Sequence, residues 1–83
     1  MDQLERIRYM EQLFDFVIEA RKEQTISQDK KARIREATRI LAEYYESNEW
    51  KQDFADDEAG LLPKDLTRGV LSEGGLWNLL THK

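Results

Sequence analysis

Apolar residues recur at helical spacing in two long stretches of this sequence, and a polar segment separates the two. In residues 4–18 the apolar side chains stand three or four positions apart, which places them on one side of a helix. The same spacing returns in residues 34–45, whereas residues 21–31 carry almost no apolar residue. We therefore predict two helices joined by a turn near residues 23–27, which pair as an antiparallel hairpin. The alternative is one continuous helix, ~65 Å long, that pairs with a second copy of itself.

The second half of the chain predicts two shorter helices. Ser47 is a suitable N-cap for a helix that carries Trp50 toward the core, and Gly60 suits the left-handed residue that ends it. Ser72 can cap a last helix, in which apolar residues are dense between positions 76 and 80. The fold class that follows is all-α, an antiparallel helical hairpin packed by two shorter C-terminal helices.

The length of 83 residues predicts one helical domain that spans residues 1–83. A chain of this size buries about 60–65% of the surface that it exposes when unfolded, so its core is small. With 40% hydrophobic and 36% charged residues, the composition is that of a globular domain rather than of a disordered segment.

The residue types argue against catalysis and against a metal or cofactor site. The sequence has no cysteine, and its one histidine, His82, lies next to the end of the chain. A nucleophilic triad needs a histidine base, and zinc needs cysteine or histidine ligands. Asp53, Asp56, Asp57 and Glu58 are acidic but lack the alternating ligands and the glycine of a calcium loop. We expect no catalytic residue, no cofactor and no metal, and a protein that is not an enzyme.

The charges bear on the compartment of the protein and on the partners that it does not bind. The net charge of −4 argues against general binding to nucleic acid. No apolar run approaches the ~20 residues that cross a bilayer, and charged residues occupy the N-terminal turn. We therefore expect a cytoplasmic protein that does not bind membranes or nucleic acid.

Charge is nevertheless distributed unevenly along the chain. Residues 21–39 contain seven basic and three acidic side chains, and residues 43–58 contain seven acidic and one basic. One interpretation is that both segments are simply solvated helix faces. A second is that the acidic third helix folds back against the basic second helix. A third is that the basic face binds an acidic partner such as RNA.

The aromatic residues are the main candidates for a binding site. Tyr44, Tyr45, Trp50, Phe54 and Trp77 either belong to the core or line a cleft. Tyr44 and Tyr45 point about 100° apart around a helix, so one of them is expected to be more exposed. We expect Trp50 to be core.

Asp53 lies one helical turn after Trp50. We predict that its carboxylate accepts hydrogen bonds from the backbone at Arg68–Gly69 or pairs with Arg68; the alternative is an exposed acid. The candidate interaction or pocket residues are thus Tyr44, Tyr45, Trp50, Asp53, Arg68 and Trp77.

Several of these residues also carry a resemblance to a known family. The pattern consists of Tyr44-Tyr45-x-Ser47-x-x-Trp50-x-x-Asp53, Leu62-Pro63, Arg68-Gly69-Val70-Leu71-Ser72-Glu73 and Leu79-Leu80. It resembles a family of small bacterial proteins catalogued as domain of unknown function 4298. Gly74 departs from the resemblance, because the family more often has an acidic residue there. The resemblance implies an all-helical bacterial protein and carries no activity, cofactor or catalytic residue that could be transferred.

The function predicted from the sequence is a small, non-enzymatic protein-interaction module that binds another protein or itself. Long opening helices offer a broad surface for such a partner. The alternative is a small-molecule or nucleotide-binding protein that uses the Tyr/Trp cluster, and an enzyme of unknown class comes third. The first function predicts an exposed apolar patch, and the second predicts a pocket lined by Tyr44 or Tyr45 together with Trp50.

Overall fold

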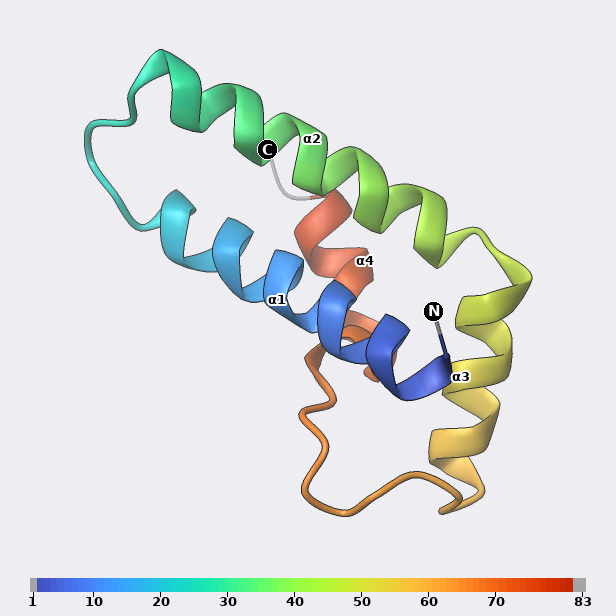
Figure 1. Cartoon of the computed structure of the whole chain (residues 1–83). Coiled ribbons are helices and arrows are strands. Elements are labelled where there is room, and N and C mark those ends of the chain that lie inside the picture. The colour runs from blue at the N-terminus through green and yellow to red at the C-terminus, as the bar shows by residue number, and fades with distance from the viewer. Residues whose placement is uncertain (1, 82–83) are drawn as a thin grey trace.

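The computed structural model describes residues 2–81, without the side chain of Glu73, and shows an all-helical chain (Figure 1). His82 lies outside the described residues. The elements are α1 (Gln3–Arg21), α2 (Gln28–Tyr45), α3 (Asn48–Glu58), a short 3₁₀ helix η1 (Gly69–Leu71) and α4 (Glu73–Thr81). The predicted fold class is confirmed.

The two long helices form the predicted hairpin, with the connection at residues 22–27. Asp2 begins α1 by accepting a hydrogen bond from the Glu5 amide over 2.9 Å. Ser27 begins α2 by accepting one from the Lys30 amide over 3.2 Å. Both caps satisfy amides that the first turn of a helix leaves without a partner, which fixes where each helix starts.

The third helix turns away from the end of α2 and closes the open end of the hairpin, as Figure 1 shows. Ser47 caps it by accepting a hydrogen bond from the Trp50 amide over 3.2 Å. Gly60 follows its C-terminus with φ +73°, a conformation that costs glycine little. The segment after Gly60 contains a turn closed by the Leu66 amide, which donates to the Pro63 carbonyl oxygen over 3.2 Å.

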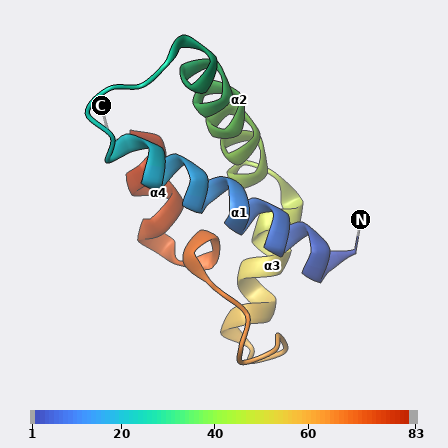
Figure 2. The ribbon, with the colours of Figure 1, turned by 60° about the vertical axis from the view of Figure 1, so that its left-hand side comes forward.

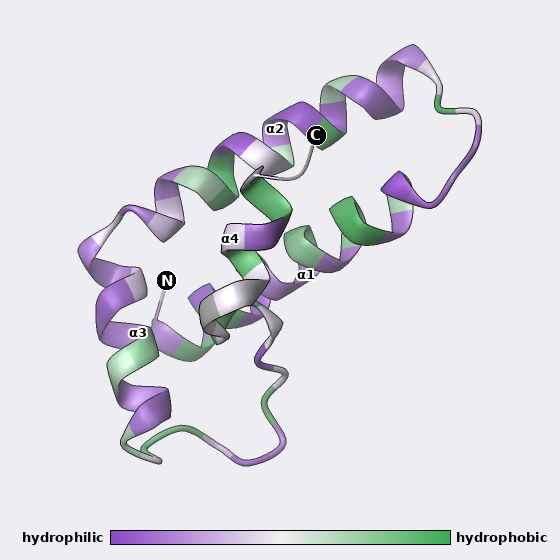
Figure 3. Cartoon of the chain, turned by 180° about the vertical axis from the view of Figure 1, so that it is seen from behind, coloured by the Kyte–Doolittle hydropathy of each residue, from purple (hydrophilic) through white to green (hydrophobic). Residues whose placement is uncertain are grey.

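The chain then returns to the hairpin through η1 and α4, which lie on one side of the α1–α2 pair (Figures 2 and 3). Ser72 accepts a hydrogen bond from the Gly75 amide over 3.0 Å and so caps α4 as predicted. A Cβ atom at Gly75 would collide with the Gly69 carbonyl oxygen and the Ser72 hydroxyl. One at Gly69 would lie 2.5 Å from a carboxylate oxygen of Glu11. These two glycines allow the close contacts that hold η1 in place.

The core lies between the hairpin and the returning segment. Its fully buried members include Ile7 and Val17 of α1, Leu41 of α2, Leu71 of η1 and Leu76 of α4. Residues far apart in the sequence therefore bury one common apolar cluster, which is the main stabilising contribution for a chain of this size. None of the described helices has both the length and the apolar character required to cross a membrane.

Of the three interpretations of the uneven charge, the one in which α3 folds back on the basic face of α2 is wrong. Among the described residues, the basic side chains of α2 that form ion pairs do so with nearby acids: Lys30 with Glu23, and Arg39 with Glu36 and Glu43. The acids of α3 instead contact α1 and the loop before η1. The short separation of α2 and α3 in the sequence forces α3 outward at the end of the hairpin, where α1 begins.

Candidate functional site

The carboxylate of Asp53 joins three helices at the closed end of the hairpin. Arg6 donates to it from Nε (3.0 Å to Oδ2) and from Nη2 (2.7 Å to Oδ1). The Tyr44 hydroxyl donates to Oδ2 over 2.6 Å, and Gln3 donates to Oδ1 over 3.1 Å. Asp53 is 0% exposed, so all of these contacts act away from water. A buried carboxylate that accepts hydrogen bonds from two other helices holds the three helices together.

The surroundings set the protonation of this cluster. Burial alone would raise the pKa of Asp53, but the hydrogen bonds from Arg6, Tyr44 and Gln3 outweigh it and hold the pKa below its ordinary value. Burial and the hydrogen bond to Asp53 raise the pKa of the Tyr44 hydroxyl well above its ordinary value. Asp53 is therefore ionised and Tyr44 neutral at neutral pH, so neither group is poised to exchange a proton with a substrate.

The predicted contact of Asp53 with the loop at Arg68–Gly69 is wrong. Glu11 of α1 occupies that position, accepting from the Gly69 amide over 3.1 Å and from the Val70 amide over 2.9 Å. Arg68 pairs instead with Asp57 and donates to the Pro63 carbonyl oxygen over 2.9 Å. Asp53 faces the hairpin rather than the loop. The residue that binds the loop, Glu11, lies 58 positions before Gly69.

Glu11 is itself only 7% exposed. Its burial raises the pKa above the ordinary value, and the two amide donors oppose this rise without cancelling it. Every buried side-chain nitrogen and oxygen atom within the described residues has a hydrogen-bond partner. The buried polar groups are thus committed to holding the helices together.

The aromatic candidates are placed at the junction of α2, α3 and η1. The Trp50 indole is half-buried, and its Nε1 donates to the Val70 carbonyl oxygen over 2.9 Å. Tyr45 meets it edge to face at 4.8 Å between ring centres, and Phe54 stacks on it at 5.2 Å. Tyr44 is buried and Tyr45 is half-buried, so the expected difference between the two tyrosines is present. This arrangement is the geometry of a packed aromatic cluster.

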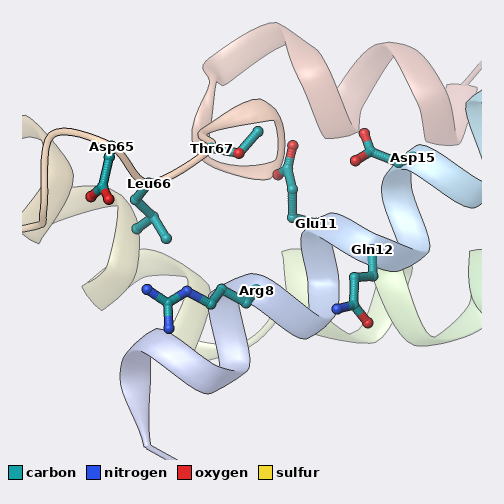
Figure 4. A pocket seen from close by; sticks show the side chains of 7 residues that line it. All are labelled: Arg8, Glu11, Gln12, Asp15, Asp65, Leu66 and Thr67. Atoms are coloured by element: carbon teal, nitrogen blue, oxygen red, sulfur yellow. The ribbon is translucent and has the colours of Figure 1, made fainter.

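Three surface pockets adjoin these contacts, and the one of about 300 Å³ is lined by Phe54, Asp57, Glu58, Arg68, Leu71 and Ser72. One, of about 270 Å³, lies between α1 and the loop before η1 and is polar (Figure 4). Its lining residues are Arg8, Glu11, Gln12, Asp15, Asp65, Leu66 and Thr67. The described residues contain no group of three potential metal ligands. A third pocket, of about 220 Å³, lies between α1 and α2 and contains Tyr44 but not Trp50, unlike the pocket expected for a ligand of the Tyr/Trp cluster.

Exposed apolar side chains are found outside the aromatic cluster at the junction of α2, α3 and η1. Trp77 of α4, a sequence candidate, is 53% exposed. A longer apolar surface runs along α1, where Tyr9 is 38% exposed, and where Leu13 and Phe16 pack partly against the core cluster and remain half-buried. Their spacing of four and three residues places them on one stripe, as in helix packing. Phe16 is five positions after Glu11, about 140° around the helix, so this stripe lies on the opposite side of α1 from η1.

We call this surface the hairpin outer face. It consists of Tyr9, Met10, Leu13 and Phe16 of α1 together with Ile40 of α2. Met10 and Ile40 line the pocket that contains Tyr44, which shows that the face continues across the groove between the two helices. The α4 helix and η1 lie on the other side of the hairpin, as a comparison of Figure 1 with Figure 3 shows.

Sequence reasoning did not identify Arg6, Glu11 or the hairpin outer face. The missed signal is that apolar residues occur on too many sides of α1. Ile7 and Phe14 meet the core, yet Tyr9 and Phe16 stand almost opposite them. Leu13 and Phe16 pack partly against the core cluster, so this second stripe is shared between the core and the solvent.

The candidate residues thus separate into a group that makes contacts between segments and one exposed residue. Tyr44, Tyr45, Trp50 and Asp53 hold helices together, Arg68 holds the loop, and Trp77 is exposed. Comparisons with curated proteins and with solved structures give no significant match. The family model of a domain of unknown function, DUF4298, matches residues 7–83. The resemblance carried by the Tyr-Tyr, Trp, Asp and Arg-Gly-Val-Leu-Ser-Glu residues is therefore confirmed, and this chain belongs to the DUF4298 family.

Proposed function

We propose that this protein is a non-enzymatic protein-interaction module and that it binds its partner through the hairpin outer face. The observation that carries the proposal is the stripe of Tyr9, Leu13 and Phe16, which remains partly open to solvent after the core has formed. Spacing of this kind is how one helix contacts another across an interface. Aromatic side chains are also the type most often responsible for binding energy at protein interfaces.

The buried polar contacts support the same proposal. Asp53 and Glu11 have shifted pKa values, which in an enzyme would mark candidate catalytic groups. Here Asp53 is enclosed by donors from three helices, and Glu11 by two backbone amides. Hydrogen bonds that join the helices account for the lowered pKa of Asp53, and burial between α1 and η1 accounts for the raised pKa of Glu11.

Site-specific photo-crosslinking tests the proposal. A photoreactive phenylalanine analogue is placed at Phe16 in the full chain, which is expressed in cells at its natural level. We expect irradiation to attach the chain to a discrete protein. The matched control carries the analogue at Asp15, one residue away on an exposed side of α1 that lines the polar pocket. Equal crosslinking at Phe16 and Asp15, or none at Phe16, would contradict the proposal.

A further inference from the structure

We propose that the partner of the hairpin outer face is a second copy of this chain, bound antiparallel so that each α1 lies on the other α1 and each α2 on the other α2. This inference rests on the proposed function and identifies its partner. Three observations carry it: the register of the hairpin, the polarity of its charge and the dimensions of its face.

The register follows from the pocket between the two helices. Arg6 and Met10 of α1 line it together with Tyr44 and Ile40 of α2. Arg6 is thus level with Tyr44, and Met10, four residues later on α1, is level with Ile40, four residues earlier on α2. This is expected for antiparallel helices, which have the same rise per residue. Continuing the same register places the middle of the hairpin between Gln12 and Leu13 on α1, level with residues 37–38 on α2.

A two-fold axis across the face at this level makes the surface complementary to itself. On α1, Tyr9 of one copy comes opposite Phe16 of the other, and the two Leu13 side chains approach each other near the axis. On α2, Arg33 of one copy comes opposite Glu43 of the other. The same two-fold axis therefore pairs aromatic side chains with aromatic side chains and a basic side chain with an acidic one. Such self-complementarity is what an isologous interface requires.

Arg33 and Glu43 are placed to take part in this contact. Arg33 is seven residues before Ile40 and so lies on the same stripe of α2. Glu43 lines the pocket beside Ile40 and accepts from Arg39 through Oε1 over 2.7 Å, which leaves Oε2 to face a partner. Both are exposed. Within residues 2–81, Arg33 forms no ion pair, so its charge is available to a partner.

The charge of the whole molecule favours the antiparallel arrangement over the parallel one. The segment 21–39, at the loop end of the hairpin, has four more basic than acidic residues, and the segment 43–58, at the other end, has six more acidic than basic. An antiparallel pair sets each basic end beside an acidic end, whereas a parallel pair would set like charges together. Complementary potentials of this kind select one docking orientation.

The dimensions of the face fit a weak dimer. Helices of 19 and 18 residues are each about 28 Å long, and two of them side by side are about 20 Å wide. The contact area is then about 560 Å² on each copy, roughly 1,100 Å² in total, which is near the lower end for specific interfaces. We expect a dimer that dissociates on dilution through the micromolar range and that weakens as salt is added.

Cysteine crosslinking tests the orientation directly, because the natural sequence has no cysteine. Chains carrying Tyr9→Cys and chains carrying Phe16→Cys, with tags of different mass, are mixed and oxidised. The antiparallel dimer predicts disulfides between the two kinds of chain in at least fivefold excess over disulfides within either kind. A parallel dimer predicts the reverse, and Asp15→Cys, outside the face, serves as the control for random collision.

A charge exchange tests whether the partner is a second copy. Arg33→Glu and Glu43→Arg should each raise the dimer dissociation constant about tenfold in sedimentation equilibrium, and the double variant should restore it. The control Arg35→Glu changes the net charge equally on another side of α2 and should leave the constant within about twofold. Failure of the double variant to restore the dimer, or a monomer for the natural chain at 1 mM, would overturn the inference.

The photo-crosslinking experiment separates this inference from the proposed function. A product of twice the mass of the chain supports both. A product in which the chain is joined to a different protein retains the interaction function and overturns the second copy as partner. Absence of any product from the analogue at Phe16 overturns the proposed function together with the inference that rests on it.

Discussion

The guanidinium of Arg6 holds both carboxylate oxygens of Asp53, a residue that lies 47 positions later in the chain. The pair connects the first turn of α1 to the middle of α3, and the Tyr44 hydroxyl adds the end of α2. Three helices therefore meet on one buried carboxylate. The hairpin is closed at this end by a charged contact rather than by apolar packing alone.

Replacing Asp53 with Asn should lower the free energy of unfolding by about 2–4 kcal/mol. The amide removes the charge that compensates Arg6 and, at either oxygen position, places a donor where two donors already point. Urea denaturation followed by circular dichroism measures the change. Glu49→Gln, an exposed substitution on the same helix, should cost less than about 0.5 kcal/mol. Equal stability of the two variants would show that the Asp53 contacts contribute nothing.

The dependence of stability on pH should have opposite signs for Asp53 and Glu11. The pKa of Asp53 is lower in the folded chain than its ordinary value, so its contribution is present above that value and is lost as the pH falls through the folded pKa. The pKa of Glu11 is raised, so its contribution is largest below the ordinary value and is lost as the pH rises through the folded pKa.

The free energy of unfolding, measured between pH 3 and 7, tests both predicted pH dependences. The cost of Asp53→Asn should be largest at neutral pH and should shrink in acid. The cost of Glu11→Gln should be largest in acid and should shrink as the pH rises. Parallel trends for the two variants would mean that burial does not dominate the environment of Glu11.

Replacing Trp50 and Trp77 separately with phenylalanine should change the free energy of unfolding by very different amounts. Trp50→Phe removes the N–H group that donates to the Val70 carbonyl oxygen, and the buried carbonyl then lacks this partner. We expect a loss of about 1–2 kcal/mol in the free energy of unfolding. Trp77 is 53% exposed, so Trp77→Phe should change it by less than about 0.5 kcal/mol. A neutral Trp50→Phe would show that the indole does not hold η1 to α3.

The elements that the sequence predicts well depend on local chemistry. Asp2, Ser27, Ser47 and Ser72 cap the four helices as their residue types require, because a cap bonds amides two or three positions away. The apolar stripes likewise follow from helical periodicity alone. Short-range rules of this kind need no knowledge of the tertiary fold.

The contacts that the sequence did not predict depend on long-range geometry. Asp53 and Glu11 are both acids on helices, and nothing in their neighbours distinguishes which one will face the loop at Gly69. That choice is made by the way α3 leaves α2, which turns Asp53 toward Arg6 and leaves the amides of η1 to Glu11. The 3₁₀ helix itself is not predicted, since its three residues carry too little pattern to recognise.

Two adjacent glycines at the start of α4 should respond oppositely to alanine. Gly74 is exposed, and a Cβ atom there would meet only the Asn78 side chain, at 3.4 Å, so Gly74→Ala should raise the free energy of unfolding by up to about 1 kcal/mol. A Cβ atom at Gly75 would strike the Gly69 carbonyl oxygen, which belongs to the backbone and cannot rotate away. Gly75→Ala should therefore cost about 1–3 kcal/mol even though alanine favours the helix. Thermal and urea unfolding of the two variants measure the difference, and a stabilising Gly75→Ala would mean that η1 and α4 are not packed as closely as Gly69 and Ser72 require.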